Sequence, residues 1–445
     1  MTAELLGMLM IIALFGLVML GAPIAFSLAF LGLLFGVIGI GPSILPLFIN
    51  RIYGLMNNQV LPAIPLFIFM GFILESCGVT EKLYDSLHGL LGPIRGGLAL
   101  ATIVISTMFA ACTGVIAASL VTMGVIGLPG MLKRGYNKEL ATGSILAGGT
   151  LGVIIPPSIV IILYGTISTL SVAKLFAAAM IPGFILSAIY FIYIIIRCLI
   201  DPNYGPAMSA EERASKNTIQ ILKDVFIYAF PTILLILLVL GSIIFGIVAI
   251  TEAAAVGAFG SILLAVAYRK FSWQSFKKAA LVTLKTTSMV LYIAIGASML
   301  SVTLIRLGGT EFLANLIVNV PSFVPDALAK WFMIGEMMFI IFIMGMFIDW
   351  IGILFIIIPM FTPIILSLGF SPIWFAVIVN INLQMAFLTP PFAYSMFFLK
   401  SVAPKEVTMS DIYRGSFPFV GLQIIGLIIA IAVPKLSLWL PSILF

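Results

Sequence analysis

Two pairs of adjacent prolines interrupt apolar stretches of this chain at a constant spacing. Pro156-Pro157 and Pro390-Pro391 lie 234 residues apart (390 − 156), and Pro129 and Pro363 keep the same offset. A proline lacks the backbone N–H donor and its ring clashes with the preceding helical turn, so each pair predicts a break in a helix. The chain is therefore expected to contain two copies of one unit, each interrupted at the same position.

A second pair of similar segments supports the duplication. Residues 78–83 (GVTEKL) correspond to residues 308–313 (GGTEFL) at an offset of 230 (308 − 78). This match lies upstream of the proline pairs, so the repeated unit extends well beyond the helix breaks.

The composition places these units in a membrane. Apolar residues make up 62% of the chain and charged residues 9%, whereas soluble domains carry about 25% charged residues. Residues 226–248 have no charge, and several other runs approach the roughly 20 residues that span a bilayer. We expect an all-α polytopic integral membrane protein with roughly ten full spans plus re-entrant pieces.

Several classes of chemistry lack the residues that they require. The one histidine is His88, and the three cysteines show no paired or metal-ligand spacing. The sequence has no Gly-rich phosphate loop of the Walker type and no serine paired with a plausible base. We therefore expect no enzymatic activity, no ATP hydrolysis and no organic cofactor. An ion gradient or a partner protein must supply the energy for any transport.

The charges of the loops predict which side of the membrane each loop occupies. Lys and Arg concentrate in four connecting segments, which are residues 133–138, 213–223, 269–285 and 400–414. Residues 247–250 and 366–371 carry neither. Basic loops remain in the cytoplasm, so the first four segments are expected inside and the other two outside.

This orientation requires two segments to enter the membrane and return on the same side. We expect residues 102–128 to form a re-entrant hairpin from the cytoplasm and residues 331–362 to form one from outside. An odd number of crossings then separates equivalent points of the two copies. The prediction is an inverted repeat with two re-entrant helical hairpins and two discontinuous helices.

Four segments follow from this interpretation. Residues 1–58 form N-terminal scaffold helices, and residues 59–200 form the first repeat with its hairpin and broken helix. Residues 201–285 contain a cytoplasmic connector, scaffold helices and an interfacial arm, and residues 286–445 form the second, inverted repeat.

The first copy offers backbone groups that could bind ions. Gly114 allows a turn at the hairpin tip beside the hydroxyl of Thr113, and residues 148–158 carry the glycines and prolines of the break. Non-helical backbone at membrane depth persists only where protein or a wet cavity satisfies it. Freed carbonyl oxygens suit a small cation, and the helix N-terminus after the break favours an anion. The alternative is that these residues only kink a helix.

The second copy adds a carboxylate. Asp349 has long apolar sequence on both sides, and an intramembrane carboxylate is a functional candidate by default. It could bind a cation or anchor the hairpin tip. Alternatively, neighbouring backbone N–H groups satisfy it and no ion binds. Its expected neighbours belong to the second break and comprise Asn382, Gln384, Ala386, Thr389, Pro390 and Pro391.

These motifs resemble one family along essentially the whole chain, the large membrane subunits of tripartite ATP-independent periplasmic (TRAP) transporters. The matching positions are Thr113-Gly114 with Ala117-Ala118-Ser119, residues 128–136, 149–158 and 251–257, Gly345 with Asp349, and residues 389–391. The resemblance implies an elevator-type importer of organic acids that is driven by sodium ions. It also implies a small membrane subunit and an extracytoplasmic solute-binding protein as partners, in the cytoplasmic membrane of a bacterium or archaeon.

The resemblance also implies roles for individual residues. The first sodium site would use Thr113, Gly114, Gly149 and Gly152, and the second Gly345, Asp349, Ala386 and Thr389. Substrate would contact residues at the first tip and at both breaks, namely Thr113, Pro156, Pro157, Ser158, Pro390 and Pro391.

One departure from the family pattern bears on the substrate. Many members carry a Ser-Gly-Ser-like first tip, whereas this chain has Thr113-Gly114-Val115-Ile116. The change removes a hydroxyl near the substrate and resembles the branch associated with 2-oxo acids, aromatic acids and other monocarboxylates. A stand-alone sodium/carboxylate symporter or antiporter of similar architecture is the alternative function.

Overall fold

The computed structural model describes residues 3–114, 116–209, 218–309, 311, 317, 321, 324–391 and 393–445. All regular elements within these ranges are helices, as the sequence predicts. The first half comprises α1 (Ala3–Met19), α2 (Ile24–Ile40), α3 (Ile44–Met56), α4 (Ala63–Ser76), α5 (Val79–Leu91), α6 (Gly97–Thr113), α7 (Ile116–Lys133), α8 (Lys138–Thr150), the short 3-10 helix η1 (Leu151–Val153), α9 (Ile159–Ser168) and α10 (Val172–Ile200).

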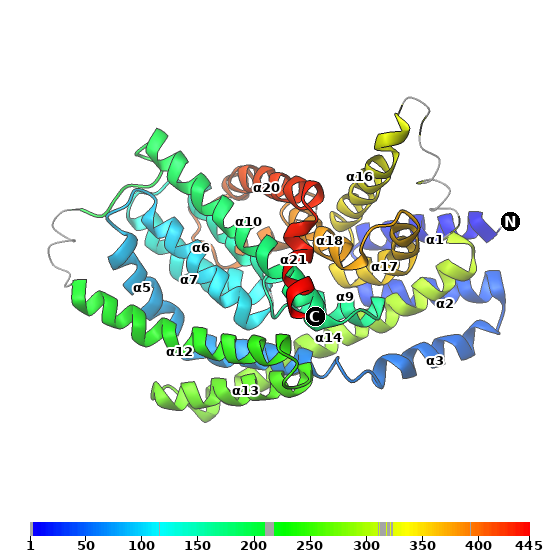
Figure 1. Cartoon of the computed structure of the whole chain (residues 1–445), viewed down its shortest axis with the longest axis horizontal. Coiled ribbons are helices and arrows are strands. Elements are labelled where there is room, and N and C mark those ends of the chain that lie inside the picture. Colours follow the sequence, from blue (N-terminus) through cyan, green and yellow to red (C-terminus); the bar gives the residue numbers. More distant parts are fainter. Residues whose placement is uncertain are drawn as a thin grey trace.

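The second half begins after the connector. It comprises α12 (Thr218–Ile244), α13 (Ile250–Ala267), α14 (Trp273–Arg306), α16 (Asp326–Gly345), α17 (Trp350–Ser367), α18 (Pro372–Phe387), α19 (Tyr394–Val402), α20 (Met409–Ala432) and α21 (Lys435–Leu444). The long α14 lies against α2, α4 and α17. In Figure 1, α3, α12 and α13 run along the lower edge of an elongated molecule.

Length and hydropathy identify the membrane-spanning helices. Within the described ranges, eight helices are long and apolar enough to cross a bilayer, or up to nine if α4 and α5, bent by 60°, form one broken span. The sequence predicts roughly ten. The two numbers differ in what they include. The eight helices include α7, α16 and α17, which are arms of the predicted hairpins, and they leave out α1, α2 and α18, which are apolar but shorter than 18 residues.

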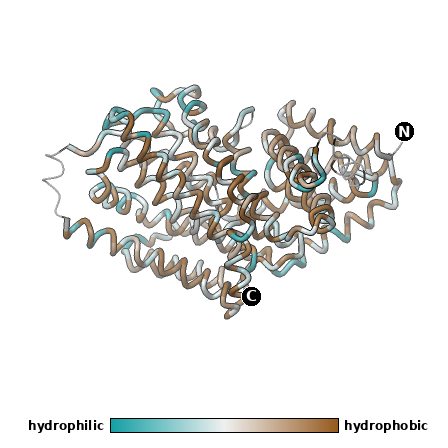
Figure 2. Tube along the Cα trace, turned by 45° about the horizontal axis from the view of Figure 1, so that its top comes forward, coloured by the Kyte–Doolittle hydropathy of each residue, from teal (hydrophilic) through white to brown (hydrophobic). Residues whose placement is uncertain are grey.

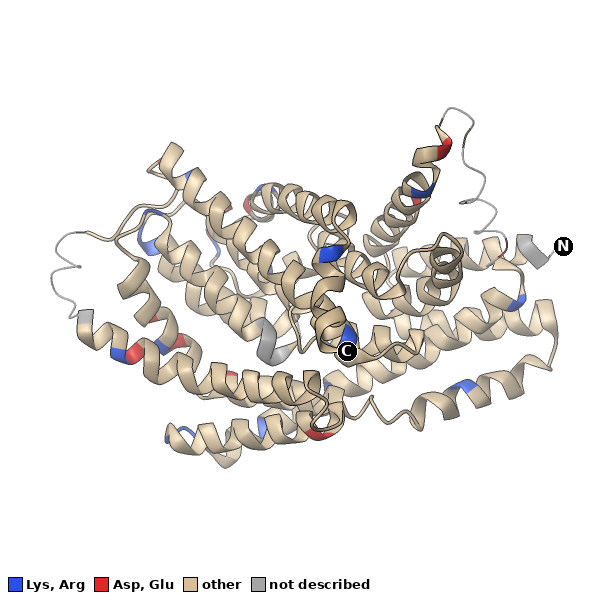
Figure 3. Ribbon diagram, in the orientation of Figure 1, with Lys and Arg blue, Asp and Glu red and all other residues tan. Residues whose placement is uncertain are grey.

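The outer surface has the character of a lipid-facing surface. Leu237 and Leu238 of α12, Phe259 of α13 and Phe26 of α2 are each about 60% exposed, and Figure 2 shows hydrophobic colouring along these peripheral helices. Soluble proteins rarely expose so many large apolar side chains in contiguous patches. Lys and Arg concentrate near helix ends (Figure 3). The chain is a multi-pass membrane protein.

Equivalent elements occur in both halves at the spacing of the proline pairs. Two residues lie between the end of α6 and the start of α7, and four lie between the end of α16 and the start of α17. Each hairpin is followed by an interrupted helix, α8–η1–α9 in the first half and α18–α19 in the second. Trp350 begins α17 234 residues after Ile116 begins α7 (350 − 116). The proline pairs lie in both interruptions, and both Pro–Pro peptide bonds are cis.

The arms of both hairpins are longer than the sequence predicts. The first hairpin extends from Gly97 to Lys133 and the second from Asp326 to Ser367. The predicted hairpins end just before Pro129 and Pro363, but both prolines lie inside helices, in α7 and α17 respectively. Lys133 and Asp326 have the charges that favour a helix C-terminus and N-terminus, respectively.

The two halves interlock at their broken helices. α9 of the first half packs against α17 and α18 of the second half, and α8 packs against α20. Trp374 of α18 is fully buried, and its indole N–H donates to the Ala430 carbonyl of α20 at 2.8 Å. The interrupted helices therefore lie in the interior of the molecule, between segments that are far apart in the sequence.

Candidate functional site

The tip of the first hairpin lies against the first helix break. Gly114 is buried and has a φ of +57°, which a residue with a side chain adopts only with strain. A Cβ atom at this position would lie 2.9 Å from the Pro157 carbonyl oxygen and 3.2 Å from the Ile159 nitrogen. A glycine is therefore required both for the turn and for the close approach. The Thr113 side chain and Val115 lie outside the described part of the structure.

The first break is stabilised by the hydroxyl of Ser158. This side chain is fully buried, donates to the Val153 carbonyl at 2.6 Å and accepts from the Ile161 N–H at 3.5 Å. It satisfies one carbonyl freed by the break and caps α9. Ser158, predicted to contact substrate, thus also holds the N-terminus of α9 in place.

The predicted glycines of the first sodium site have structural surroundings of their own. Gly149 packs against Leu120 of α7 so closely that a Cβ would overlap the leucine side chain. Gly152 lies in η1 and is buried. Gly149 therefore lets α8 approach the second arm of the hairpin. The 3-10 helix η1 begins two residues after Gly149, at Leu151.

The tip of the second hairpin lies against the second break in the same way. A Cβ at Gly345 would overlap the Cβ of Ala386 at the end of α18. The structure thus brings Gly345 and Ala386 together, and it brings Gly114 and Pro157 together in the first half. In each half, a glycine at or near the hairpin turn allows the backbone to touch the interrupted helix.

Asp349 caps the second arm of its hairpin. The half-buried carboxylate accepts from the Ile351 N–H at 3.2 Å at the N-terminus of α17, where a negative charge is stabilised by the helix dipole. Tyr394, the first residue of α19, lies within electrostatic range of this carboxylate. The backbone contact is the one expected if N–H groups satisfy Asp349.

The second break contains buried polar groups without partners. The Thr389 hydroxyl donates to the Met385 carbonyl at 2.7 Å, and the Asn382 amide donates to the Met338 carbonyl at 2.6 Å. The Asn382 Oδ1, both polar atoms of Gln384 and the Ser395 hydroxyl are buried and find no hydrogen-bond partner within the described residues. Leaving such a group unpaired costs about 1–3 kcal/mol, so this region favours a polar ligand or water.

The sequence prediction missed two polar sites. Ser395 lies in the first turn of α19. Its position shortly after Pro390-Pro391 in the sequence could have identified it as part of the second break. Glu75, at the end of α4, accepts a hydrogen bond from Thr122 of α7. Nothing in the sequence marks that contact, because it joins segments 47 residues apart.

Comparison with known proteins identifies a family of membrane transporters that resembles this chain. Residues 11–436 match the family model described as "Tripartite ATP-independent periplasmic transporter, DctM component". The chain is 30% identical to the C4-dicarboxylate TRAP transporter large permease protein DctM of Vibrio cholerae, over 98% of this chain and 97% of that protein. It is 25% identical to the sialic acid TRAP transporter large permease protein SiaM of the same organism, over 96% of each chain.

Solved transporters share the fold at low sequence identity. The Neisseria gonorrhoeae MtrF structure aligns with a TM-score of 0.58 and 13% identity, covering 89% of this chain and 85% of that one. The Alcanivorax borkumensis YdaH transporter aligns with a TM-score of 0.57 and 13% identity, covering 88% and 87%. These likenesses concern the fold alone.

The family match covers nearly the whole chain, and the family consists of transporter subunits rather than enzymes. Members work with a small membrane subunit and a solute-binding protein. This chain belongs to the DctM family, the large permease subunits of TRAP transporters.

Proposed function

We propose that this protein imports an organic acid across the cytoplasmic membrane and that sodium ions flowing inward drive the import. The observation that carries the proposal is that each hairpin contacts its own helix break through a glycine, Gly114 at Pro157 and Gly345 at Ala386. Two such contacts in one interior create two equivalent places where irregular backbone can bind a cation.

Sodium would bind at both contacts. The first site would use Thr113, Gly114, Gly149 and Gly152, and the second would use Gly345, Asp349, Ala386 and Thr389. Carbonyl, hydroxyl and carboxylate oxygens are hard ligands that suit a small cation. The Asp349 carboxylate would add the charge that a backbone site lacks. Its bond to Ile351 leaves further lone pairs available.

The substrate carboxylate would lie between the two breaks. The N-termini of α9 and α19 carry the positive end of the helix dipole, and α18 packs against both η1 and α9. Substrate contacts would come from Thr113, Pro156, Pro157, Ser158, Pro390 and Pro391. Val115 and Ile116 offer no hydroxyl beside the first tip, which favours a 2-oxo acid or another monocarboxylate over a C4-dicarboxylate.

Movement would follow an elevator mechanism in an inverted repeat. Residues 59–200 and 286–445 would form the two repeats and carry the site. Residues 1–58 and 201–285 would supply the scaffold helices, the connector and the interfacial arm. The peripheral position of α3, α12 and α13 in Figure 1 suits a scaffold role.

Two partners would complete the transporter, a small membrane subunit and an extracytoplasmic solute-binding protein that delivers the acid. The relatives differ in their substrates: their names specify C4-dicarboxylate, sialic acid and ectoine transport. The binding protein is therefore the component whose ligand identifies the substrate of this system.

Uptake by proteoliposomes tests the coupling. They would contain this chain and the small subunit, and would receive the binding protein loaded with radiolabelled acid. An inward sodium gradient should drive uptake, and a protonophore should leave it unchanged. A potassium gradient of equal size is the control. Uptake driven equally well by a proton gradient without sodium would contradict the proposal.

A further inference from the structure

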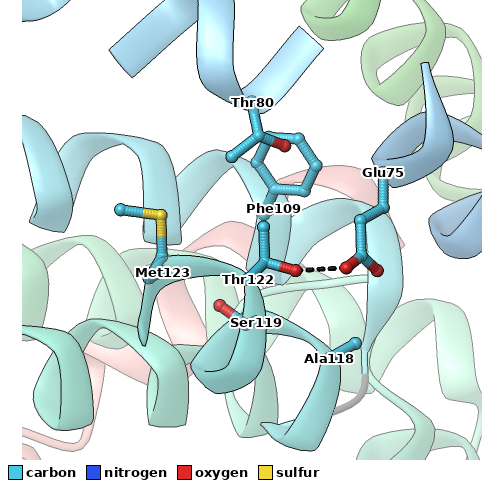
Figure 4. Close-up of a pocket in the computed structure, with 7 residues that line it drawn as sticks. All are labelled: Glu75, Thr80, Phe109, Ala118, Ser119, Thr122 and Met123. Atoms are coloured by element: carbon cyan, nitrogen blue, oxygen red, sulfur yellow. Dashed lines mark hydrogen bonds between the residues drawn. The ribbon is translucent and has the colours of Figure 1, made fainter. Parts of the chain in front are cut away.

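A small cavity with polar walls lies beside the first hairpin, away from its tip. It lies between α4, α5, α6 and α7, and its polar lining consists of Glu75, Thr80, Ser119 and Thr122. Its volume of about 10 Å³ is enough for one atom-sized occupant. Figure 4 shows Thr122 bonded to Glu75, Ser119 on the same helix, and Thr80 reaching in from α5.

The polar side chains that line this cavity supply only oxygen atoms, and Phe109, Ala118 and Met123 complete its lining. One Glu75 oxygen accepts from the Thr122 hydroxyl. The other Glu75 oxygen and the hydroxyls of Thr80 and Ser119 are buried and have no hydrogen-bond partner in the described structure. Thr80 is 1% exposed and Ser119 is 4% exposed. Three unpaired oxygens beside one atom-sized space suit a ligand that interacts with oxygen atoms.

The charge of the carboxylate decides what kind of occupant suits the cavity. Glu75 lies at the end of an apolar helix, where an unneutralised charge is strongly disfavoured. Lys278 of α14 attracts it electrostatically, but the unpaired Glu75 oxygen still lacks a direct partner within the described residues. A water molecule would form hydrogen bonds with the oxygens but would not neutralise the Glu75 carboxylate. A small cation would bind the oxygens and also neutralise this charge.

We propose that Glu75, Thr80, Ser119 and Thr122 bind one sodium ion. This site differs from the two at the hairpin tips, since Ser119 lies five residues (119 − 114) beyond Gly114 along the second arm. α4 also packs against α13 and α14. The bound ion would join the second arm of the first hairpin to α4 and α5, so it would control how easily the end of α4 moves away from the hairpin.

Alkylation of Cys77 provides a local test. Cys77 follows Glu75 by two residues, is 4% exposed and contacts the Ile73 carbonyl, so it reacts only when the end of α4 opens. The full-length protein in nanodiscs would carry Cys112→Ala and Cys198→Ala. At sodium about ten times its dissociation constant, the alkylation rate should fall about tenfold relative to equal potassium.

Four variants separate the possible outcomes. Glu75→Gln should abolish the sodium effect, and Ser119→Ala should weaken it. Glu81→Gln, which removes an exposed carboxylate in the first turn of α5, should retain it as the matched control. Asp349→Asn should also retain the sodium effect on Cys77 alkylation, because Asp349 does not line this cavity. This assay therefore tests the cavity independently of sodium-coupled uptake.

Three results would overturn the proposal. They are an alkylation rate that does not respond to sodium in the parent protein, a full sodium effect in Glu75→Gln, and protection that follows pH instead of sodium. The first would show that the cavity holds no sodium ion, and the second would show that sodium acts at another site. The third would show that the carboxylate is neutralised by a proton.

Discussion

Single glycines determine how closely the hairpins approach the interrupted helices. Gly114 needs its positive φ and has the Pro157 carbonyl against it, and Gly345 touches Ala386. The family resemblance of the sequence implied both as sodium-site residues. Which atoms they touch could not be predicted, because those contacts depend on how distant helices pack.

Asp349 illustrates the same limit. Its isolation among apolar residues predicted an important carboxylate, and the structure adds that it caps α17 through the Ile351 N–H. Sequence reasoning left the cap and the cation ligand as alternatives. A carboxylate has several lone pairs, so one cap bond does not exclude the other role.

Asp349→Asn separates these two roles. Asparagine caps helices about as well as aspartate, so the helix should form and the protein should insert normally. The variant lacks the charge, and interactions with charged groups contribute about 1.5–3 kcal/mol. The sodium concentration for half-maximal uptake should therefore rise roughly 10- to 100-fold. Unchanged sodium dependence would identify Asp349 as a helix cap alone.

At the scale of elements, the proline pairs predicted the breaks well. Helices end before Pro156-Pro157 and Pro390-Pro391 as the missing N–H donors require. The ends of the hairpin arms were predicted poorly, because α7 and α17 continue through Pro129 and Pro363, just beyond the predicted ends. The first break also uses η1 and the Ser158 cap, which proline chemistry alone does not specify.

The side of the membrane that each hairpin enters is a prediction from loop charge that cysteine labelling can test. Lys133→Cys and Lys277→Cys replace side chains near helix ends that are accessible to solvent, and both should react with an impermeant reagent only from the cytoplasmic side. Ser371→Cys, between α17 and α18, should react only from outside. Labelling of all three from one side would contradict the inverted repeat.

At the scale of the whole molecule, the interior is formed by elements from both halves. α9 lies against α17 and α18, and α8 lies against α20. The 234-residue spacing of the proline pairs predicted the matching order of elements in the two halves. The contacts of α8 and α9 with the second half could not be predicted, because no short sequence pattern specifies which distant helices pack together. The Glu75–Thr122 contact escaped prediction for the same reason.

The central claim is that the glycine contacts, Gly114 at Pro157 and Gly345 at Ala386, form the two sodium sites that drive transport. The most direct measurement is the sodium dependence of uptake by Gly114→Ala and Gly345→Ala, with Gly335→Ala as the control. A Cβ atom added at Gly335 would meet no other atom within 4 Å. An alanine at Gly114 must adopt a left-handed conformation, which costs about 1–2 kcal/mol before any clash.

Both tip variants should therefore need roughly tenfold more sodium or lose uptake, while Gly335→Ala should behave as the parent protein does. Matched insertion into the membrane would be verified by the yield of monodisperse protein. Wild-type sodium dependence in either tip variant would contradict the claim, because it would show that the hairpin in that half can move away from its helix break without affecting coupling.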